Sequence, residues 1–317
     1  MAAIPPRIQA LAEARTLLFV PGDRPERHAK ALGAGADGVI IDLEDAVAPA
    51  AKAAAAEALR ATWPALAATP GRPPLVLRCN AAGTPWFEAD LALAAALRPD
   101  ALLLPKAESP EQLAACAARL ALDPAAGAEG SPCAGAPRTA GATEGGGVGG
   151  PDQPAIALLP LIETAAGLAA VRPIAASGQV LRLILGHLDL QADLGLACSD
   201  DERELDAVRF ELVLASRLAG LPAPLDGVTV ATDDAARLAA DTERARRFGF
   251  TGKLCIHPRQ VAGVHAGFAP GAERLAWARR VLDAVAAMPN GAEAVDGKMV
   301  DAPVIKLAQQ VLAAARA

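Results

Sequence analysis

Short apolar runs rich in Val, Ile and Leu alternate along the chain with longer Ala-rich segments. The eight runs cover residues 16–20, 38–43, 74–77, 101–104, 156–162, 181–185, 227–230 and 253–256. Nearly continuous apolar runs suit strands that are covered on both faces, and their alternation with helices indicates parallel βαβ units. Eight such units predict an α/β fold with a closed (β/α)8 barrel, the TIM barrel.

The segments between the runs carry the helical pattern, and several begin with Pro, Ser, Thr or Asp at a capping position. The predicted helices cover residues 24–32, 51–62, 85–97, 110–120, 204–218 and 234–248. A doubly wound open sheet is the alternative, but that fold usually has a glycine-rich nucleotide turn after its first strand. No Gly-x-Gly-x-x-Gly follows residues 16–20, so the closed barrel is favoured.

Two segments do not fit the repeating pattern. Residues 123–155 are rich in Gly, Pro, Ala and Ser and have no periodicity, which predicts a disordered loop. Their place between the fourth helix and the fifth strand predicts the face of the barrel opposite the catalytic loops. Beyond a catalytic barrel of residues 1–267, residues 268–317 predict a helical lid or oligomerisation arm.

Composition narrows the function classes. The hydrophobic fraction of 53% is inflated by Ala, and no run of about 18 apolar residues predicts a membrane span. The first fifteen residues lack the apolar core of a secretory signal, so we expect a cytoplasmic protein. Five scattered cysteines without a Cys-x-x-Cys pair predict neither a disulfide framework nor a zinc site. A net charge of -6 and 3% aromatics argue against nucleic acid as a partner.

Polar residues follow every predicted strand, at the barrel end where catalytic residues lie. They are Pro21-Gly22-Asp23-Arg24, Asp42-Leu43-Glu44-Asp45, Arg78-Cys79-Asn80, Lys106, Glu163-Thr164, Asp189, Thr232-Asp233-Asp234 and His257. Glu163 and Asp189 end neighbouring strands, so their carboxylates can converge on one hard cation such as Mg²⁺, or Mn²⁺ in its place. The alternative is that each acid caps the following helix or pairs with a nearby cation.

The cations on this rim each allow two interpretations. Arg78 is either an ion-paired strand end or a group that binds an anionic substrate or a developing enolate. Lys106 could form a Schiff base with a carbonyl substrate. Pairing with Asp42, Glu44 or Asp45 would instead keep it protonated, and we favour that interpretation.

Histidines give weaker signals. His187 precedes Asp189 on the rim and could touch substrate. His257 is followed by Pro258 and opens a helix, where it could simply bind loop backbone. His28 and His265 fall within helical segments and are expected to pack or lie at the surface.

Taken together, the motifs identify a resemblance that covers nearly the whole chain. They are RTLLFVPGDRPER at 15–27, IDLEDAVAP at 41–49, RCN at 78–80, LPK at 104–106, IETAAG at 162–167, DLQADLG at 189–195, GKLCIHPRQ at 252–260 and DGKMVD at 296–301. The chain resembles the HpcH/HpaI aldolase and citrate lyase β-subunit superfamily, and especially its stand-alone acyl-CoA lyases.

This resemblance implies roles for individual residues. It implies Mg²⁺ bound by Glu163 and Asp189, with Arg78 at the substrate oxyanion. An acid of the last motif reaches a neighbouring subunit's site in malyl-CoA-lyase-like members, which implies a homotrimer or hexamer. The predicted catalytic residues are Arg78, Asp301 and Asp45, and the predicted substrate-binding residues are Arg15, Pro21, Gly22, Glu44, Asn80, Lys106 and His187.

One departure bears on the substrate. Many members read Gly-Ala-Glu-Asp-Leu around the second metal ligand, whereas this chain reads Gly-His-Leu-Asp-Leu at 186–190. The identity of the substrate is therefore left open by the motifs.

The expected activity is Mg²⁺-dependent cleavage of a 3-hydroxy-3-carboxyacyl thioester into an acyl thioester and a 2-oxo acid. Malyl-CoA and citramalyl-CoA are the leading substrates, with acyl-CoA and 2-oxo acid as the only expected partners besides further copies of the chain. The alternatives are a pyruvate aldolase that acts on a free hydroxy-oxo acid, a citrate lyase β subunit within a larger complex, and a catalytically silent binding subunit.

Overall fold

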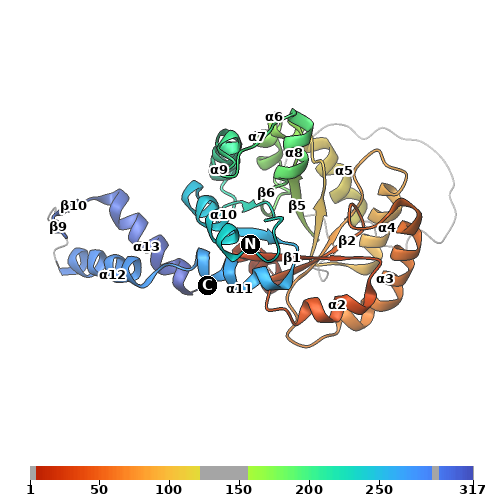
Figure 1. Cartoon of the computed structure of the whole chain (residues 1–317), viewed down its shortest axis with the longest axis horizontal. Helices are drawn as coiled ribbons and strands as arrows, with labels where there is room; N and C mark the ends of the chain where they lie inside the picture. Colours follow the sequence, from red (N-terminus) through yellow and green to blue (C-terminus); the bar gives the residue numbers. More distant parts are fainter. Residues whose placement is uncertain (1–4, 122–155, 288–292, 317) are drawn as a thin grey trace, which may run out of the picture.

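The barrel predicted from the apolar runs is confirmed by the computed structural model, which describes residues 5–121, 156–287 and 293–316 (Figure 1). Its strands are β1 (Thr16–Pro21), β2 (Gly38–Asp42), β3 (Leu75–Arg78), β4 (Ala101–Leu104), β5 (Ala157–Ile162), β6 (Ile184–Leu185), β7 (Leu225–Asp226) and β8 (Gly252–Cys255). Each strand runs parallel to its neighbours, and pairing of β1 with β8 closes the barrel. The predicted loop at 123–155 lies outside the described residues.

Helices surround the barrel and include all six that the periodicity predicts. They are α1 (Pro6–Glu13), α2 (Pro25–Leu32), α3 (Lys52–Ala67), α4 (Phe87–Leu97), α5 (Pro110–Ala121), α6 (Ala165–Ala169), α7 (Val171–Ala175), α8 (His187–Leu194), α9 (Asp206–Leu218), α10 (Ala235–Phe248) and α11 (Pro258–Phe268). The caps explain some of these bounds. For example, α10 begins after Asp234, whose side chain accepts the Arg237 N–H, and ends at Gly249 in a left-handed conformation.

Successive strand residues point to opposite faces, and both faces are covered. Leu17 and Leu254 pack inside the barrel, whereas Leu18 and Val39 pack between the barrel and its helices. Because neither face meets water, the strands read as continuous apolar runs instead of alternating ones.

The prediction for the seventh strand was wrong by two residues. The strand is Leu225–Asp226 and not 227–230, because Gly227 already packs against a side chain from α8 and Val230 is 62% exposed. Two valines in a rim loop, Val228 and Val230, therefore resembled a strand. The sixth strand is also shorter than predicted, with Val180 forming only an isolated bridge to Leu158.

After the barrel the chain forms a separate arm. It consists of α12 (Ala272–Ala287), an antiparallel hairpin of β9 (Glu293–Val295) and β10 (Lys298–Val300), and α13 (Ala302–Arg316). These elements bury their own small core, which includes Ala278, Val281, Ala308 and Val311. Figure 1 shows the arm extending away from the side of the barrel. Among the described helices, none is both long and apolar enough to span a membrane.

Candidate active site

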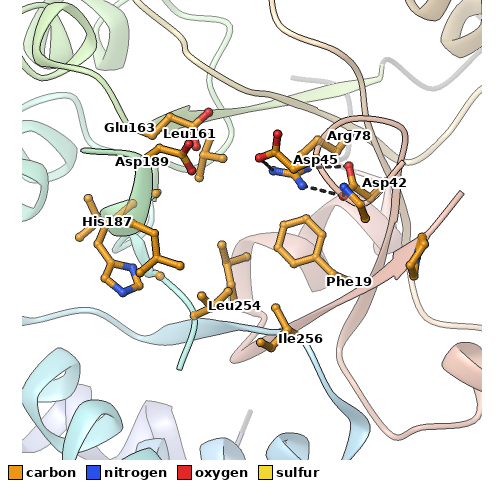
Figure 2. A pocket seen from close by; sticks show the side chains of 17 residues that line it. Phe19, Asp42, Asp45, Arg78, Leu161, Glu163, His187, Asp189, Leu254 and Ile256 are labelled. Carbon is orange, nitrogen blue, oxygen red and sulfur yellow. Dashed lines mark hydrogen bonds and ion pairs between the residues drawn. The ribbon is translucent and has the colours of Figure 1, made fainter. Parts of the chain in front are cut away.

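A pocket of ≈ 390 Å³ opens at the carboxyl ends of the strands (Figure 2). It is lined by Phe19, Pro21, Asp42, Asp45, Ala46, Arg78, Leu161, Glu163, Leu185, Gly186, His187, Leu188, Asp189, Gly227, Val228, Leu254 and Ile256. The pocket therefore brings together residues from one end of the barrel, which belong to β1, β2, β3, β5, β6, β7 and β8 or to the loops after them. In TIM-barrel enzymes, catalytic residues lie at this end.

Arg78 dominates the charged side of the pocket. Its Nε and Nη2 donate to Asp42 at 2.7 and 2.6 Å, and Nη1 lies 2.8 Å from Oε2 of Glu44. Its guanidinium also lies 4.8 Å from the ring centroid of Phe19. Burial alone would lower the pKa of Arg78, but the hydrogen bonds and charge of Asp42 raise it. Arg78 is thus a fixed, permanently charged donor at the pocket wall.

The ion pair predicted for Lys106 is present. Its Nζ lies 3.3 Å from Oε1 of Glu44. Burial alone would lower the pKa of Lys106, but the Glu44 charge raises it above its ordinary value. An amine that stays protonated is a poor nucleophile, so the geometry favours ion pairing over Schiff-base chemistry.

Glu163 and Asp189 supply the acidic side of the pocket, and their side chains point toward one another in Figure 2. Oε1 of Glu163 accepts the backbone N–H of Lys106 at 2.8 Å. Burial, followed by the charges of Glu44 and Asp189, raises the pKa of Glu163 to about 8. Gly186 makes room for this carboxylate, because a Cβ there would lie 2.6 Å from Oε2.

These two acids have the chemistry of a hard-cation site. Within the described ranges, no three or more His, Cys, Asp or Glu side chains meet in a group that could hold a metal ion. Two carboxylates that repel each other and leave several coordination positions to water and a ligand are the donor set typical of Mg²⁺. Besides burial, the charges of Glu44 and Asp189 contribute to the raised pKa of Glu163, and a divalent cation would offset that repulsion.

Comparison with known proteins shows the family of the chain. Residues 15–258 match the HpcH/HpaI aldolase/citrate lyase family. The chain belongs to this family. It is therefore an enzyme of the lyase type, and the alternative of a catalytically silent binding subunit is not supported.

Relatives in the family share almost the whole chain. A citrate lyase subunit beta-like protein of Mycobacterium tuberculosis is 37% identical over 93% of this chain and 93% of its own length. A (3S)-malyl-CoA thioesterase of Cereibacter sphaeroides is 32% identical over 96% and 95%. A mitochondrial citramalyl-CoA lyase of Rattus norvegicus is 28% identical over 94% and 85%.

A solved structure extends the likeness to three dimensions. The protein CitE from Mycobacterium tuberculosis, in complex with magnesium, acetoacetate and coenzyme A, superposes with a TM-score of 0.76 at 35% identity. The alignment covers 96% of this chain and 99% of that one.

His187 is one of the two residues, with Leu188, at which residues 186–190 differ from the pattern expected for the family. It is buried, and its Nε2 lies 3.6 Å from Oε1 of Glu202. Burial lowers the pKa of His187 to about 4, which outweighs the opposing effect of the Glu202 and Asp226 charges. The ring is therefore neutral at physiological pH.

Not all residues predicted to form the site line the pocket. Arg15 precedes β1 and so lies at the opposite end of the barrel, because a strand carries its two ends to opposite faces. Asn80 donates its backbone and side-chain N–H groups to Asp90 at 2.8 and 2.6 Å and faces α4. We therefore do not retain Arg15 or Asn80 as pocket residues.

Three further residues considered from the sequence, Gly22, Asp301 and His257, also do not line the pocket. Gly22 lies beside the pocket, donates to the Asp42 carbonyl at 2.7 Å, and has no room for a Cβ. Asp301 directly precedes α13 in the arm, where its side chain accepts the Val304 N–H at 3.1 Å, and it does not line the pocket of its own chain. His257 accepts the Arg259 N–H and caps α11, which is the structural role considered from the sequence.

Sequence reasoning missed two features of the site. Phe19 points inward beneath Arg78, and only its position two residues after the inward-facing Leu17 could have indicated this. It also missed a buried charge network behind the pocket, in which Asp226 lies 3.5 Å from Arg209 and near Lys253. The members of this network are far apart in sequence, so no single motif contains them together.

Proposed function

We propose that the protein is a Mg²⁺-dependent carbon–carbon lyase that cleaves a 3-hydroxy-3-carboxyacyl-CoA thioester into an acyl-CoA and a 2-oxo acid. Malyl-CoA and citramalyl-CoA are the leading substrates. The observation that carries the proposal is the pair of converging carboxylates, Glu163 and Asp189, across the pocket from the fixed cation Arg78 (Figure 2). The named activities of the relatives support the same class of substrate.

Glu163 and Asp189 would hold the Mg²⁺ ion in this proposal. Bound there, Mg²⁺ would lower the free energy of negative charge on the hydroxyl and carboxylate oxygens of the substrate. The Lys106 N–H fixes one oxygen of Glu163, so the carboxylate is oriented before the ion arrives. The magnesium in the Mycobacterium tuberculosis structure is consistent with this assignment.

Residues of the chain itself would then accept the proton of the substrate and stabilise the negative charge that develops. Asp45 lines the pocket with an exposed side chain, and it would accept the proton of the substrate hydroxyl. The carbon–carbon bond breaks, and its electron pair moves into the thioester to give an enolate. Arg78 would donate to the enolate oxygen, and because Asp42 already fixes the guanidinium, no reorganisation is required.

The enolate carbon must regain a proton, and we propose that Asp301 of a neighbouring subunit provides it. Within one chain Asp301 lies in the arm, which extends away from the barrel (Figure 1), and it does not line the pocket. Exposed apolar side chains on the rim, Leu188, Val230 and Ile256, and the 69% exposed Met299 beside Asp301 support docking of one subunit's arm on another's rim. The barrel of residues 1–267 and the arm of 268–317 would then act as separate units of a trimer or hexamer.

Hydrolysis is the second candidate, because one relative is named a thioesterase. The two reactions differ in their products. Carbon–carbon cleavage of malyl-CoA yields acetyl-CoA and glyoxylate, whereas hydrolysis yields malate and free CoA. In a thioesterase the pocket would have to admit water to the thioester carbonyl.

The test is product analysis by chromatography after incubation with malyl-CoA or citramalyl-CoA, with Mg²⁺ or with a chelator. We expect acetyl-CoA and the 2-oxo acid in equal amounts, only when Mg²⁺ is present. Free CoA without a 2-oxo acid would establish the thioesterase instead. Cleavage of a free hydroxy-oxo acid, or of a thioester only on an acyl-carrier protein, would establish the pyruvate aldolase or the citrate lyase β subunit.

A further inference from the structure

A second pocket of ≈ 450 Å³ adjoins the candidate active site. His187, Leu188 and Val228 line both pockets. Gly227 lines only the first pocket and Glu202 only the second. The boundary between the two spaces therefore passes through these three shared residues.

The imidazole of His187 occupies this boundary and is held from both sides. A Cβ on Gly227 would lie 2.0 Å from Nδ1, so the ring packs directly on the glycine backbone. On the other side Nε2 faces Glu202, which is itself fixed by Arg209 at 2.5 Å and Arg244 at 2.8 Å. The ring is thus a rigid partition between the pockets.

The first pocket has a charged side and an apolar side. Asp42, Asp45 and Arg78 form the charged side, and Leu185, Val228, Leu254 and Ile256 form the apolar side. In the proposed reaction, the oxo oxygen and one carboxylate oxygen of the 2-oxo acid face Glu163 and Asp189, and the acyl thioester lies at Arg78. Only one further group of the 2-oxo acid then remains to be accommodated. That group is the substituent on its oxo carbon, and it faces the apolar side, which the His187 partition closes.

We propose that His187 is a specificity-determining residue that restricts this substituent to hydrogen or methyl. Shortening the side chain would join the second pocket to the first and admit longer, uncharged substituents. Anionic substituents would gain nothing, because three carboxylates, Asp200, Glu202 and Asp241, line the second pocket with a single guanidinium, Arg237. The inference rests on the proposed function for the orientation of the substrate.

The experiment compares 2-oxo acids in the condensation direction with acetyl-CoA and Mg²⁺. The acids are glyoxylate, pyruvate, 2-oxobutyrate, 2-oxovalerate and oxaloacetate, and the enzymes are the wild type, His187→Ala, His187→Ser and His187→Phe. We expect kcat/KM for 2-oxobutyrate and 2-oxovalerate relative to pyruvate to rise at least tenfold in the Ala and Ser variants. One methylene in an apolar pocket changes this ratio roughly 10- to 200-fold.

Two controls separate partition size from other effects. His187→Phe keeps a flat ring without nitrogens and should retain the wild-type selectivity. Cys198→Ala changes a residue that lines only the second pocket and should also leave the ratio unchanged. Oxaloacetate should not improve in any variant.

Calorimetric binding of the same acids in the presence of Mg²⁺ gives a readout that does not depend on turnover. If neither enzyme forms a thioester product but the Ala variant binds 2-oxobutyrate at least tenfold better relative to pyruvate, the proposed function fails and the partition stands. If the wild type is active and both ratios stay unchanged in folded Ala and Ser variants, the partition is wrong and the proposed function stands.

Discussion

The backbone N–H of Lys106 donates a 2.8 Å hydrogen bond to Oε1 of Glu163. Lys106 adopts a left-handed conformation, with φ at 48°, although it is not a glycine. Such a conformation is unfavourable for a residue with a side chain, so it is kept where surrounding contacts determine it. Lys106, in the loop after β4, thus orients Glu163, which directly follows β5, through its backbone N–H. The side chain of Lys106 pairs with Glu44.

Removing either proposed metal ligand should abolish Mg²⁺-dependent turnover. Glu163→Gln and Asp189→Asn keep the shape of the side chains but remove the charge, and we expect losses of roughly 100- to 1,000-fold or more. The melting temperature should show that the barrel remains folded. Full activity of either variant at limiting Mg²⁺ would contradict the assignment.

The raised pKa of Glu163 predicts pH-dependent metal binding. With a pKa of about 8 in the metal-free protein, Glu163 holds a proton at pH 6 to 7 that Mg²⁺ must displace. Calorimetric affinity for Mg²⁺ should therefore increase from pH 6 to 8, by up to about tenfold per pH unit, with proton release. An affinity that does not change over this range would show that Glu163 is already ionised.

The same shift affects stability with a definite sign. The folded pKa is higher than the ordinary value of 4.5, so the folded state retains a proton that the unfolded state loses. This contribution is fully present below pH 4.5 and disappears as the pH rises through 8. Without Mg²⁺, the wild type should lose more stability over this window than Glu163→Gln, as measured by denaturant unfolding.

If Lys106 serves as an ion-pair partner, it should not form an imine. Borohydride treatment during turnover should leave the mass of the Lys106 peptide unchanged. Lys106→Arg keeps the charge opposite Glu44 and should retain far more activity than Lys106→Met. A reduced substrate adduct on Lys106 would replace the proposed mechanism with Schiff-base chemistry.

An active site shared between two subunits predicts that assemblies of two different inactive variants regain activity. Arg78→Ala and Asp301→Ala chains should each be nearly inactive alone. Co-refolding the two should create sites with Arg78 from one subunit and Asp301 from another, and should restore part of the wild-type activity. If subunit exchange is demonstrated by mass spectrometry and no activity returns, Asp301 acts within its own chain or only caps α13.

The barrel could be predicted from sequence because its strands are buried on both faces, and this burial produces apolar runs that are visible one after another. Glu163 and Asp189 could be placed because they directly follow such runs. Where strands are only two residues long the bounds were less accurate: the run predicted for β6 was too long, and β7 was placed on residues 227–230, which follow it. The motif that contains Arg15 could not show that it precedes β1 and does not line the pocket, because a motif records neighbours in sequence and not the barrel end at which each residue lies.

The contact between Gly227 and His187 constrains how this chain can evolve. A methyl group at position 227 would lie 2.0 Å from Nδ1 of His187, so Gly227→Ala alone should be strongly destabilising. In a chain that already carries a small residue at 187, the same change would no longer meet the imidazole ring. Substitutions at the two positions are therefore not independent, and a lineage could reach Ala at 227 only after position 187 had lost its ring.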